Sequence, residues 1–191
     1  PARGGVLLLG NHISFIDWAL VQMASPRQLH FVIEKGYYER WYTKRVLDWF
    51  GVIPISSGAS ADSLEKVTEY LNKGEVVCLF PEGSISRTGQ MSDFKRGYER
   101  AVRDTSAVIV PFYLHGLWGS RFSRSSGFLR ENRQSGFKRN IVVSFGKALP
   151  QTTTAPDLKQ KVFDLSVASW EAYSFMLDPI PVSWLKSAKR M

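Results

Sequence analysis

A histidine and an aspartate five positions apart are the residues of this chain best suited to chemistry. They stand in the run Asn11-His12-Ile13-Ser14-Phe15-Ile16-Asp17, where a strand-like stretch gives way to a turn. A neutral imidazole accepts a proton near pH 7, and a carboxylate on its other nitrogen fixes the tautomer and stabilises the charged ring. The pair is therefore suited to deprotonate a hydroxyl group. A histidine that caps the next helix is the structural alternative, which the pair alone does not exclude.

Three further short runs follow in fixed order along the chain. They are Gly51-Val52-Ile53-Pro54-Ile55, Phe80-Pro81-Glu82-Gly83 and Val110-Pro111-Phe112. No Gly-x-Ser-x-Gly turn accompanies them, and no cysteine is placed for activation, so the sequence offers no enzyme nucleophile. An attacking hydroxyl would have to come from a substrate.

Apolar strand-like runs alternate with helix-like stretches along the whole chain. The patterns predict strands at 6–9, 29–33, 52–55, 76–80, 107–114 and 141–145, and helices at 13–23, 37–50, 62–74, 97–105 and 158–175. This alternation predicts an α/β fold with a mainly parallel sheet flanked by helices. Because no repeat or low-complexity linker interrupts it, we expect residues 1–191 to form a single domain.

Polar residues follow four of the predicted strands. His12 comes after the first, Lys35 after the second, Ser56 and Ser57 after the third, and residues 82–87 after the fourth. In open α/β sheets the functional site forms beyond the carboxyl ends of the strands. The sequence therefore predicts that these four signals converge on one edge of the sheet.

Charge and cysteine content narrow the class of protein. The 191 residues carry a formal net charge of +8, which predicts an acidic partner such as an anionic membrane, a phosphorylated substrate, an acidic carrier protein or nucleic acid. A single cysteine excludes an internal disulfide and a cysteine-based metal cluster, and it fits a reducing, cytoplasmic setting. No apolar run approaches the ~18 residues that span a bilayer. Since the chain starts at Pro1 and opens almost directly into a strand, we interpret it as a segment of a longer protein.

Two stretches favour contact with an anionic membrane surface. Residues 118–139 hold six Lys or Arg and one acid, interleaved with phenylalanines, and residues 37–50 hold a cluster of tyrosines and tryptophans. A solvated loop and a packed helix face are the respective alternatives. Nucleic acid is the weakest partner, because no known binding motif accompanies the basic loop.

The order and spacing of the four runs resemble the glycerolipid acyltransferase family, whose members move a fatty acyl group from a thioester to a glycerophosphate or lysophospholipid hydroxyl. Residues 94–122 look most like the acyltransferase domains that bacteria fuse to an acyl–carrier-protein synthetase and a lysophospholipid transporter. The resemblance implies an αβα sandwich, a lysophospholipid acceptor and acyl carrier protein or coenzyme A as the carrier of the acyl group. It also implies no metal and no cofactor, and a place at the cytoplasmic face of the inner membrane, peripheral or tethered by segments outside this chain.

The family's pattern also assigns roles to residues of this chain. His12 matches the general base and Asp17 the group that orients it, and backbone N–H groups near the turn would stabilise the oxyanion. Substrate-binding roles fall on Asn11, Lys35, Glu82, Gly83, Ser84 and Arg87. Val110, Pro111 and Phe112 match a strand that lines the acyl or acceptor site, and a plain core strand is the alternative.

The chain departs from the family's pattern at two places. Ile85 stands where the third motif usually has arginine, and Arg87, two positions on, becomes the candidate phosphate contact. The second motif ends Ile55-Ser56-Ser57, without the arginine common in relatives that act on lysophosphatidate. This loss of charge favours a phosphodiester acceptor such as lysophosphatidylethanolamine. A catalytically silent lipid-binding module and an acyl-thioester hydrolase remain as alternative functions.

Overall fold

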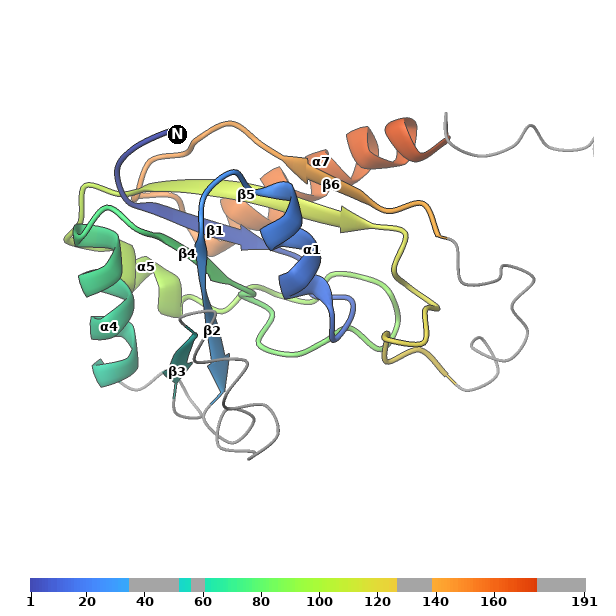
Figure 1. Ribbon diagram of the computed structural model, residues 1–191, viewed down its shortest axis with the longest axis horizontal. Helices are drawn as coiled ribbons and strands as arrows, with labels where there is room; N and C mark the ends of the chain where they lie inside the picture. The colour runs from blue at the N-terminus through green and yellow to red at the C-terminus, as the bar shows by residue number, and fades with distance from the viewer. Residues whose placement is uncertain (35–51, 56–60, 127–138, 175–191) are drawn as a thin grey trace, which may run out of the picture.

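A six-stranded sheet forms the centre of the molecule (Figure 1). The computed structural model describes residues 1–34, 52–55, 61–126 and 139–174. In this part of the chain the strands are β1 Val6–Gly10, β2 Leu29–Glu34, β3 Ile53–Ile55, β4 Val76–Leu79, β5 Val108–His115 and β6 Val142–Phe145. Their order is β3-β2-β4-β1-β5-β6, and every pair is parallel except β5 with β6. The predicted α/β fold with a mainly parallel sheet is confirmed.

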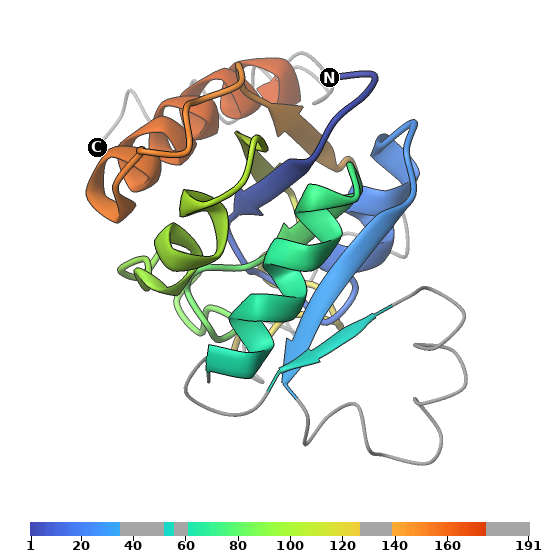
Figure 2. The same ribbon diagram turned by 90° about the vertical axis from the view of Figure 1, so that its left-hand side faces the viewer.

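Helices cover both faces of this sheet. They are α1 Asp17–Ala24, α4 Ala61–Asn72, α5 Gly97–Arg103 and α7 Ala155–Ser174. Figure 2 shows α4, α5 and α7 together in front of the sheet and α1 behind it. Within the described residues, no helix is both long and apolar enough to cross a bilayer.

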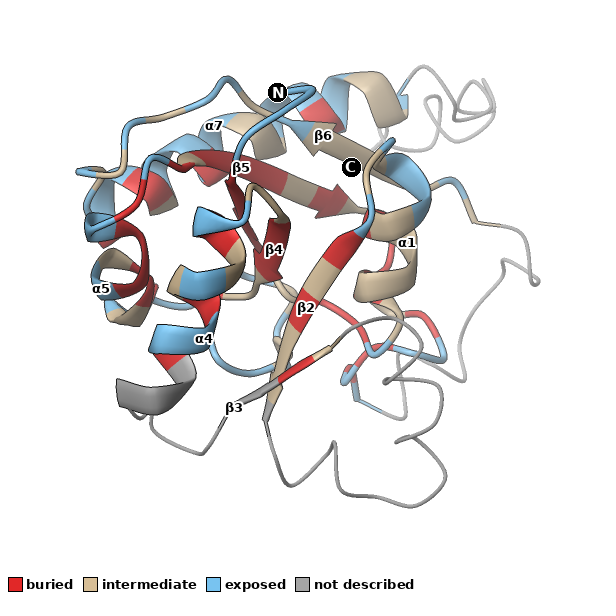
Figure 3. Cartoon of the chain, turned by 60° about the vertical axis from the view of Figure 1, so that its left-hand side comes forward, coloured by how far each residue is buried: buried red, intermediate tan, exposed pale blue. Residues whose placement is uncertain are grey.

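The central strand β1 is buried along its whole length, and its neighbours β4 and β5 are largely buried as well (Figure 3). Leu7 and Leu9 pack into the cluster beneath α4, α5 and α7, whereas Val6 and Leu8 pack into the cluster that contains Val21 of α1. A strand covered on both faces has no polar side, which is why this stretch is an unbroken apolar run. The end of β1 is therefore a firmly held point from which the next loop departs.

Two predicted helix boundaries are wrong, for local physical reasons. The helix predicted at 13–23 begins only at Asp17, because the N–H groups of Ile13 and Ser14 donate to the Asp17 carboxylate. The helix predicted at 158–175 begins at Ala155, where Thr154 Oγ1 accepts from the Asp157 N–H at 3.4 Å, which caps the first turn, and donates to the Asp157 carboxylate at 2.6 Å. The helix and aromatic cluster predicted at 37–50 lie outside the described residues.

Candidate active site

The loop that follows β1 is anchored to β5 before it reaches His12. A side chain at Gly10 would meet the carbonyl oxygen of Phe112 at 2.5 Å, so glycine lets the two strands approach here. The next side chain, Asn11, is buried, and its amide pairs with the backbone of Leu114: Nδ2 donates to the carbonyl at 3.0 Å and Oδ1 accepts from the N–H at 2.7 Å. Asn11, predicted to bind substrate, thus has its amide engaged within the fold.

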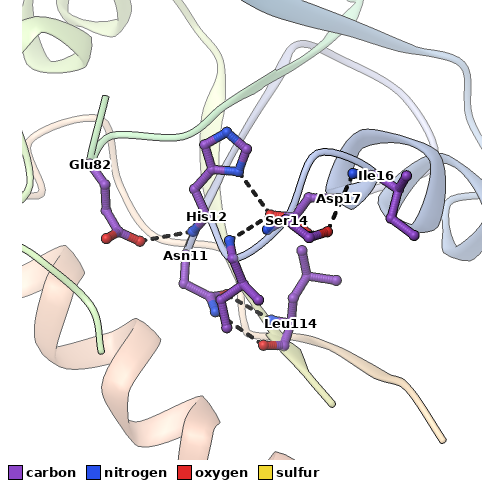
Figure 4. A network of polar contacts seen from close by, with 8 residues as sticks. Asn11, His12, Ser14, Ile16, Asp17, Glu82 and Leu114 are labelled. Atoms are coloured by element: carbon purple, nitrogen blue, oxygen red, sulfur yellow. Dashed lines mark hydrogen bonds and ion pairs between the residues drawn. The ribbon is translucent and has the colours of Figure 1, made fainter. Parts of the chain in front are cut away.

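The fully buried carboxylate of Asp17 organises the turn (Figure 4). Its Oδ2 accepts from the N–H groups of Ile13 at 2.7 Å and Ser14 at 3.0 Å and lies 2.8 Å from His12 Nδ1. Its Oδ1 accepts from Ser14 Oγ at 2.5 Å. Burying a carboxylate is costly unless donors surround it, and here four donors do so.

The contact with Asp17 determines which nitrogen of His12 is basic. An ionised carboxylate only accepts hydrogen bonds, so Nδ1 carries the proton and Nε2 keeps its lone pair. Nε2 points away from Asp17 (Figure 4), and the side chain is 21% exposed. The ring also stacks on Phe80, with centroids 4.1 Å apart and planes 14° from parallel. Asp17 and Phe80 therefore fix the orientation of the imidazole ring, and part of the side chain stays exposed to solvent.

Glu82 ties the loop after β4 to the loop after β1. Its Oε1 accepts from the His12 N–H at 2.8 Å, and its Oε2 accepts from the N–H of Ser92 at 2.9 Å and from Ser92 Oγ at 2.8 Å. The Ser86 N–H in turn donates to the His12 carbonyl at 2.8 Å. Gly83 follows in a left-handed conformation with φ +72. The buried Glu82, predicted to bind substrate, has both of its oxygens committed to this junction.

The N–H groups of the turn are already donating within the fold. Those of residues 12–14 donate to Glu82 and Asp17, that of Phe15 to the Phe122 carbonyl at 2.9 Å, and that of Ile16 to Ser14 Oγ at 3.3 Å. All five have an acceptor within the fold, so oxyanion donors near the turn would have to be other N–H groups.

A pocket of about 480 Å³ opens along the loop after β4. Ser84 and Arg87, both predicted to bind substrate, line it, and so does Arg124, which sequence reasoning missed. Arg124 comes from the segment after β5, which a Ser14–Ser123 bridge joins to the loop after β1. Its only sequence signal is its place in a basic stretch, which does not distinguish it from its neighbours.

The remaining predicted site residues lie further from the pocket or cannot be placed. Val110 and Phe112 are buried in the core. The ring centroids of Phe112 and Phe80 lie 5.9 Å apart, and Phe80 in turn stacks on His12. Pro111 lies in the same buried strand on the opposite face, against Gly146. Lys35 and the pair Ser56 and Ser57 lie outside the described residues.

The other histidines lie away from His12. His30 is in β2, 3.7 Å from Glu75, and His115 packs against Trp170 and Tyr173 of α7. Burial lowers the pKa of His115. In the described part of the chain no three His, Cys, Asp or Glu side chains gather as metal ligands would.

Comparisons with known proteins agree on one family. Residues 1–115 match the family model described as Acyltransferase. A chloroplastic 1-acyl-sn-glycerol-3-phosphate acyltransferase of Arabidopsis thaliana is 28% identical over 125 residues, which are 63% of this chain and 35% of that protein. The 1-acyl-sn-glycerol-3-phosphate acyltransferase of Borreliella burgdorferi is 26% identical over 120 residues, 60% of this chain and 47% of that protein. The chain thus spans about a third to a half of the length of these relatives.

A solved structure has the same fold. The crystal structure of PlsC from Thermotoga maritima, a 1-acyl-sn-glycerophosphate acyltransferase, superposes with a TM-score of 0.62. The match covers 94% of this chain and 69% of that one, at 13% sequence identity. It supports the α/β arrangement of sheet and helices.

Proposed function

Because the chain belongs to the acyltransferase family, we propose that it transfers a fatty acyl group from a thioester to the free hydroxyl of a lysophospholipid. The observation that carries the proposal is the 2.8 Å contact between His12 Nδ1 and the buried Asp17 carboxylate. In the neutral ring it leaves the lone pair on Nε2, on a side chain that is 21% exposed, and the backbone of His12 is hydrogen-bonded to the loop that carries Arg87.

The proposed reaction moves one proton in a closed sequence. His12 Nε2 takes the proton from the acceptor hydroxyl, and the resulting alkoxide attacks the carbonyl carbon of the thioester. The tetrahedral intermediate then expels the sulfur: the C–S bond breaks, the ester remains, and the imidazolium returns the proton to the thiolate. This route needs no metal and no cofactor, with acyl carrier protein or coenzyme A bearing the acyl group as co-substrate.

Donors for the oxyanion would come from the loop after β4. The N–H groups of Ser84 and Ile85 have no acceptor among the described residues, and both residues line the pocket of Arg87. We assign them to the developing negative charge of the thioester oxygen.

The acceptor headgroup would bind at Arg87. Guanidinium suits a phosphate through its planar fork of donors, and Arg87 is an exposed residue that lines the pocket. The relatives are named for 1-acylglycerol-3-phosphate, which favours lysophosphatidate as the acceptor. Lysophosphatidylethanolamine, favoured by the missing arginine of the second motif, is the acceptor to compare with it.

A membrane surface is the proposed source of that acceptor. Phe15 and Phe122 flank the catalytic turn, are 50% and 51% exposed, and are joined by a backbone hydrogen bond of 2.9 Å. Two half-exposed aromatic rings beside a basic segment suit the headgroup boundary of an anionic bilayer. We place the domain at the cytoplasmic face of the membrane, docked from the side that carries these rings.

The direct test replaces the base. His12→Ala should lower ester formation at least about 100-fold, because general-base catalysis contributes that much or more. The assay incubates the protein with acyl carrier protein or coenzyme A thioesters and a panel of lysophospholipids, and mass spectrometry identifies the products. His30→Ala, near the amino ends of the strands, is the matched control and should retain activity.

Each unfavourable result points to a different alternative. Full activity of His12→Ala would contradict the mechanism. Release of free fatty acid with no ester, whichever acceptor is present, would identify an acyl-thioester hydrolase. Vesicle binding without any turnover of thioester would identify a silent lipid-binding module.

A further inference from the structure

Arginines from two distant segments line a pocket whose loop is hydrogen-bonded to the backbone of His12 through Ser86. Arg87 belongs to the loop after β4 and Arg124 to the segment after β5, and both border the same cavity of about 480 Å³. Its lining also includes four hydroxyl-bearing residues, Ser84, Ser86, Thr88 and Ser92, together with Ile85, Gln90 and Met91. A concave site with two guanidinium groups and several hydroxyls has the composition that binds a phosphate group.

Backbone contacts hold Arg124 at this pocket. The Phe15 N–H donates to the Phe122 carbonyl, and Ser14 and Ser123 form a bridge between the two segments. Ser123 and Ser125, the sequence neighbours of Arg124, are buried, and their hydroxyl oxygens lie 2.9 Å apart. The segment is thus fastened to the turn that carries His12 and Asp17, and its register determines where Arg124 stands.

The loop that carries Arg87 is closed in a similar way. Ser86 Oγ donates to the Gln90 carbonyl at 2.8 Å and accepts from the Gly89 N–H at 3.0 Å. The Ser86 N–H donates to the His12 carbonyl. Both arginines therefore project from backbone that is hydrogen-bonded to the catalytic turn.

No acid balances the two guanidinium groups. Neither Arg87 nor Arg124 forms an ion pair with another described residue. Glu82, the acid of the same loop, is buried and occupied by the His12 N–H and by Ser92. Two positive charges that share one pocket repel each other, and an anion with more than one negative charge relieves that repulsion.

We infer that Arg124 is the second phosphate-binding residue and that Arg87 and Arg124 together hold a phosphate monoester of the acceptor. The inference rests on the proposed function and goes beyond it, because it names the headgroup charge that the site selects. Two guanidinium groups match the dianion of a phosphate monoester better than the single charge of a phosphodiester. Arg124 thereby supplies charge that the second motif lacks, and the acceptor is lysophosphatidate rather than lysophosphatidylethanolamine.

Binding of glycerol 3-phosphate, which has the headgroup without the acyl chain, tests the site without any turnover. Isothermal titration of the whole chain should show binding that weakens about tenfold or more in Arg124→Gln and in Arg87→Gln. Arg124→Lys, which keeps the charge but loses the fork, should fall between Arg124→Gln and the parent. Arg103→Gln, an exposed arginine of α5, is the matched control and should bind as the parent does.

Kinetics then test the choice of headgroup. Arg124→Gln should raise the KM for lysophosphatidate at least about tenfold, leave kcat nearly unchanged, and affect lysophosphatidylethanolamine much less. Equal effects on both acceptors would overturn the inference, as would unchanged binding of glycerol 3-phosphate by Arg124→Gln. A loss confined to the binding of coenzyme A, whose 3′-phosphate is also a monoester, would assign Arg124 to the donor and overturn it too.

The outcome is separable from that of the proposed function. His12→Ala should still bind glycerol 3-phosphate, and this binding should still depend on Arg124. If the parent protein binds the headgroup in this way but forms no ester, the anion site stands and the proposed function fails.

Discussion

At the scale of single residues, one carboxylate shapes the turn after β1 and, in the proposed mechanism, also orients the base. Asp17 accepts from two backbone N–H groups, from Ser14 Oγ and from His12 Nδ1. The same oxygen, Oδ2, serves the backbone and the imidazole. A change at Asp17 should therefore disturb catalysis and stability together.

Asp17→Asn tests this double role. One acceptor oxygen becomes an N–H₂ group that faces donors, so we expect kcat to fall about 10²- to 10⁴-fold and the free energy of unfolding to fall by about 1–3 kcal/mol. Steady-state kinetics and urea unfolding measure the two effects. Ser14→Ala is the control: it removes the 2.5 Å bond to Oδ1 and the 3.3 Å bond from the Ile16 N–H but keeps the contact between Asp17 and His12, so it should cost much less activity. A stable Asp17→Asn protein with full kcat would remove the orienting role.

At the scale of the elements, His115 joins the end of β5 to the last turns of α7. Its ring lies 5.4 Å from Trp170 and 4.6 Å from Tyr173, both in an edge-on arrangement. Burial lowers the pKa of His115, so the packed arrangement favours the neutral ring. Protonation should weaken the docking of α7 on the sheet.

The pH dependence of stability follows with a definite sign. Because the folded pKa lies below the unfolded value of about 6.5, the contribution of His115 is complete above about pH 6.5 and is lost as the pH falls through the folded pKa. Urea unfolding at about pH 8 and about pH 5 should show a smaller decrease for His115→Gln than for the parent. His30→Gln is the control and should show the same decrease in unfolding free energy as the parent. A decrease of the same size in His115→Gln and the parent would contradict this account.

The local pattern of the sequence predicts most helices and strands, but it does not predict the contacts between residues that are distant in sequence. The buried run of β1, the alternation of strands and helices, and the pairing of His12 with Asp17 are all local in sequence, and each is present in the structure. The start of α1 is not predictable from apolar periodicity, because hydrogen bonds to Asp17 override it. Glu82 contacts His12, which lies 70 positions away, and Ser123, the neighbour of Arg124, forms a bridge to Ser14. No short-range pattern in the sequence predicts either contact.

At the scale of the whole molecule, the proposed membrane contact combines positive charge with exposed aromatic rings. A net charge of +8 would favour an anionic bilayer, and Phe15 and Phe122 are exposed at and beside the turn that carries His12. Phe163, similarly exposed at 54%, lies on α7, which covers the opposite face of the sheet from α1 (Figure 2). The molecule therefore offers a test of which side meets the lipid.

Replacing both rings, Phe15→Ser with Phe122→Ser, should lower partitioning onto phosphatidylglycerol-containing vesicles by roughly tenfold, since each ring loses part of its burial energy. Vesicle flotation measures the effect, which should shrink as salt screens the charges. Phe163→Ser should bind as the parent does. Equal losses in the two variants, or none in either, would contradict docking from the side of the catalytic turn.

The three successive N–H groups of His12, Ile13 and Ser14 all end on carboxylates, so this stretch of loop has few alternative conformations. Ordering a free loop residue costs roughly 1–2 kcal/mol in entropy, and here that cost falls on folding rather than on each encounter with lipid. In the proposed mechanism the base would therefore meet every acceptor in the same conformation. Differences in turnover between lipids should then reflect how each lipid fits a rigid template, not how the protein adapts to it.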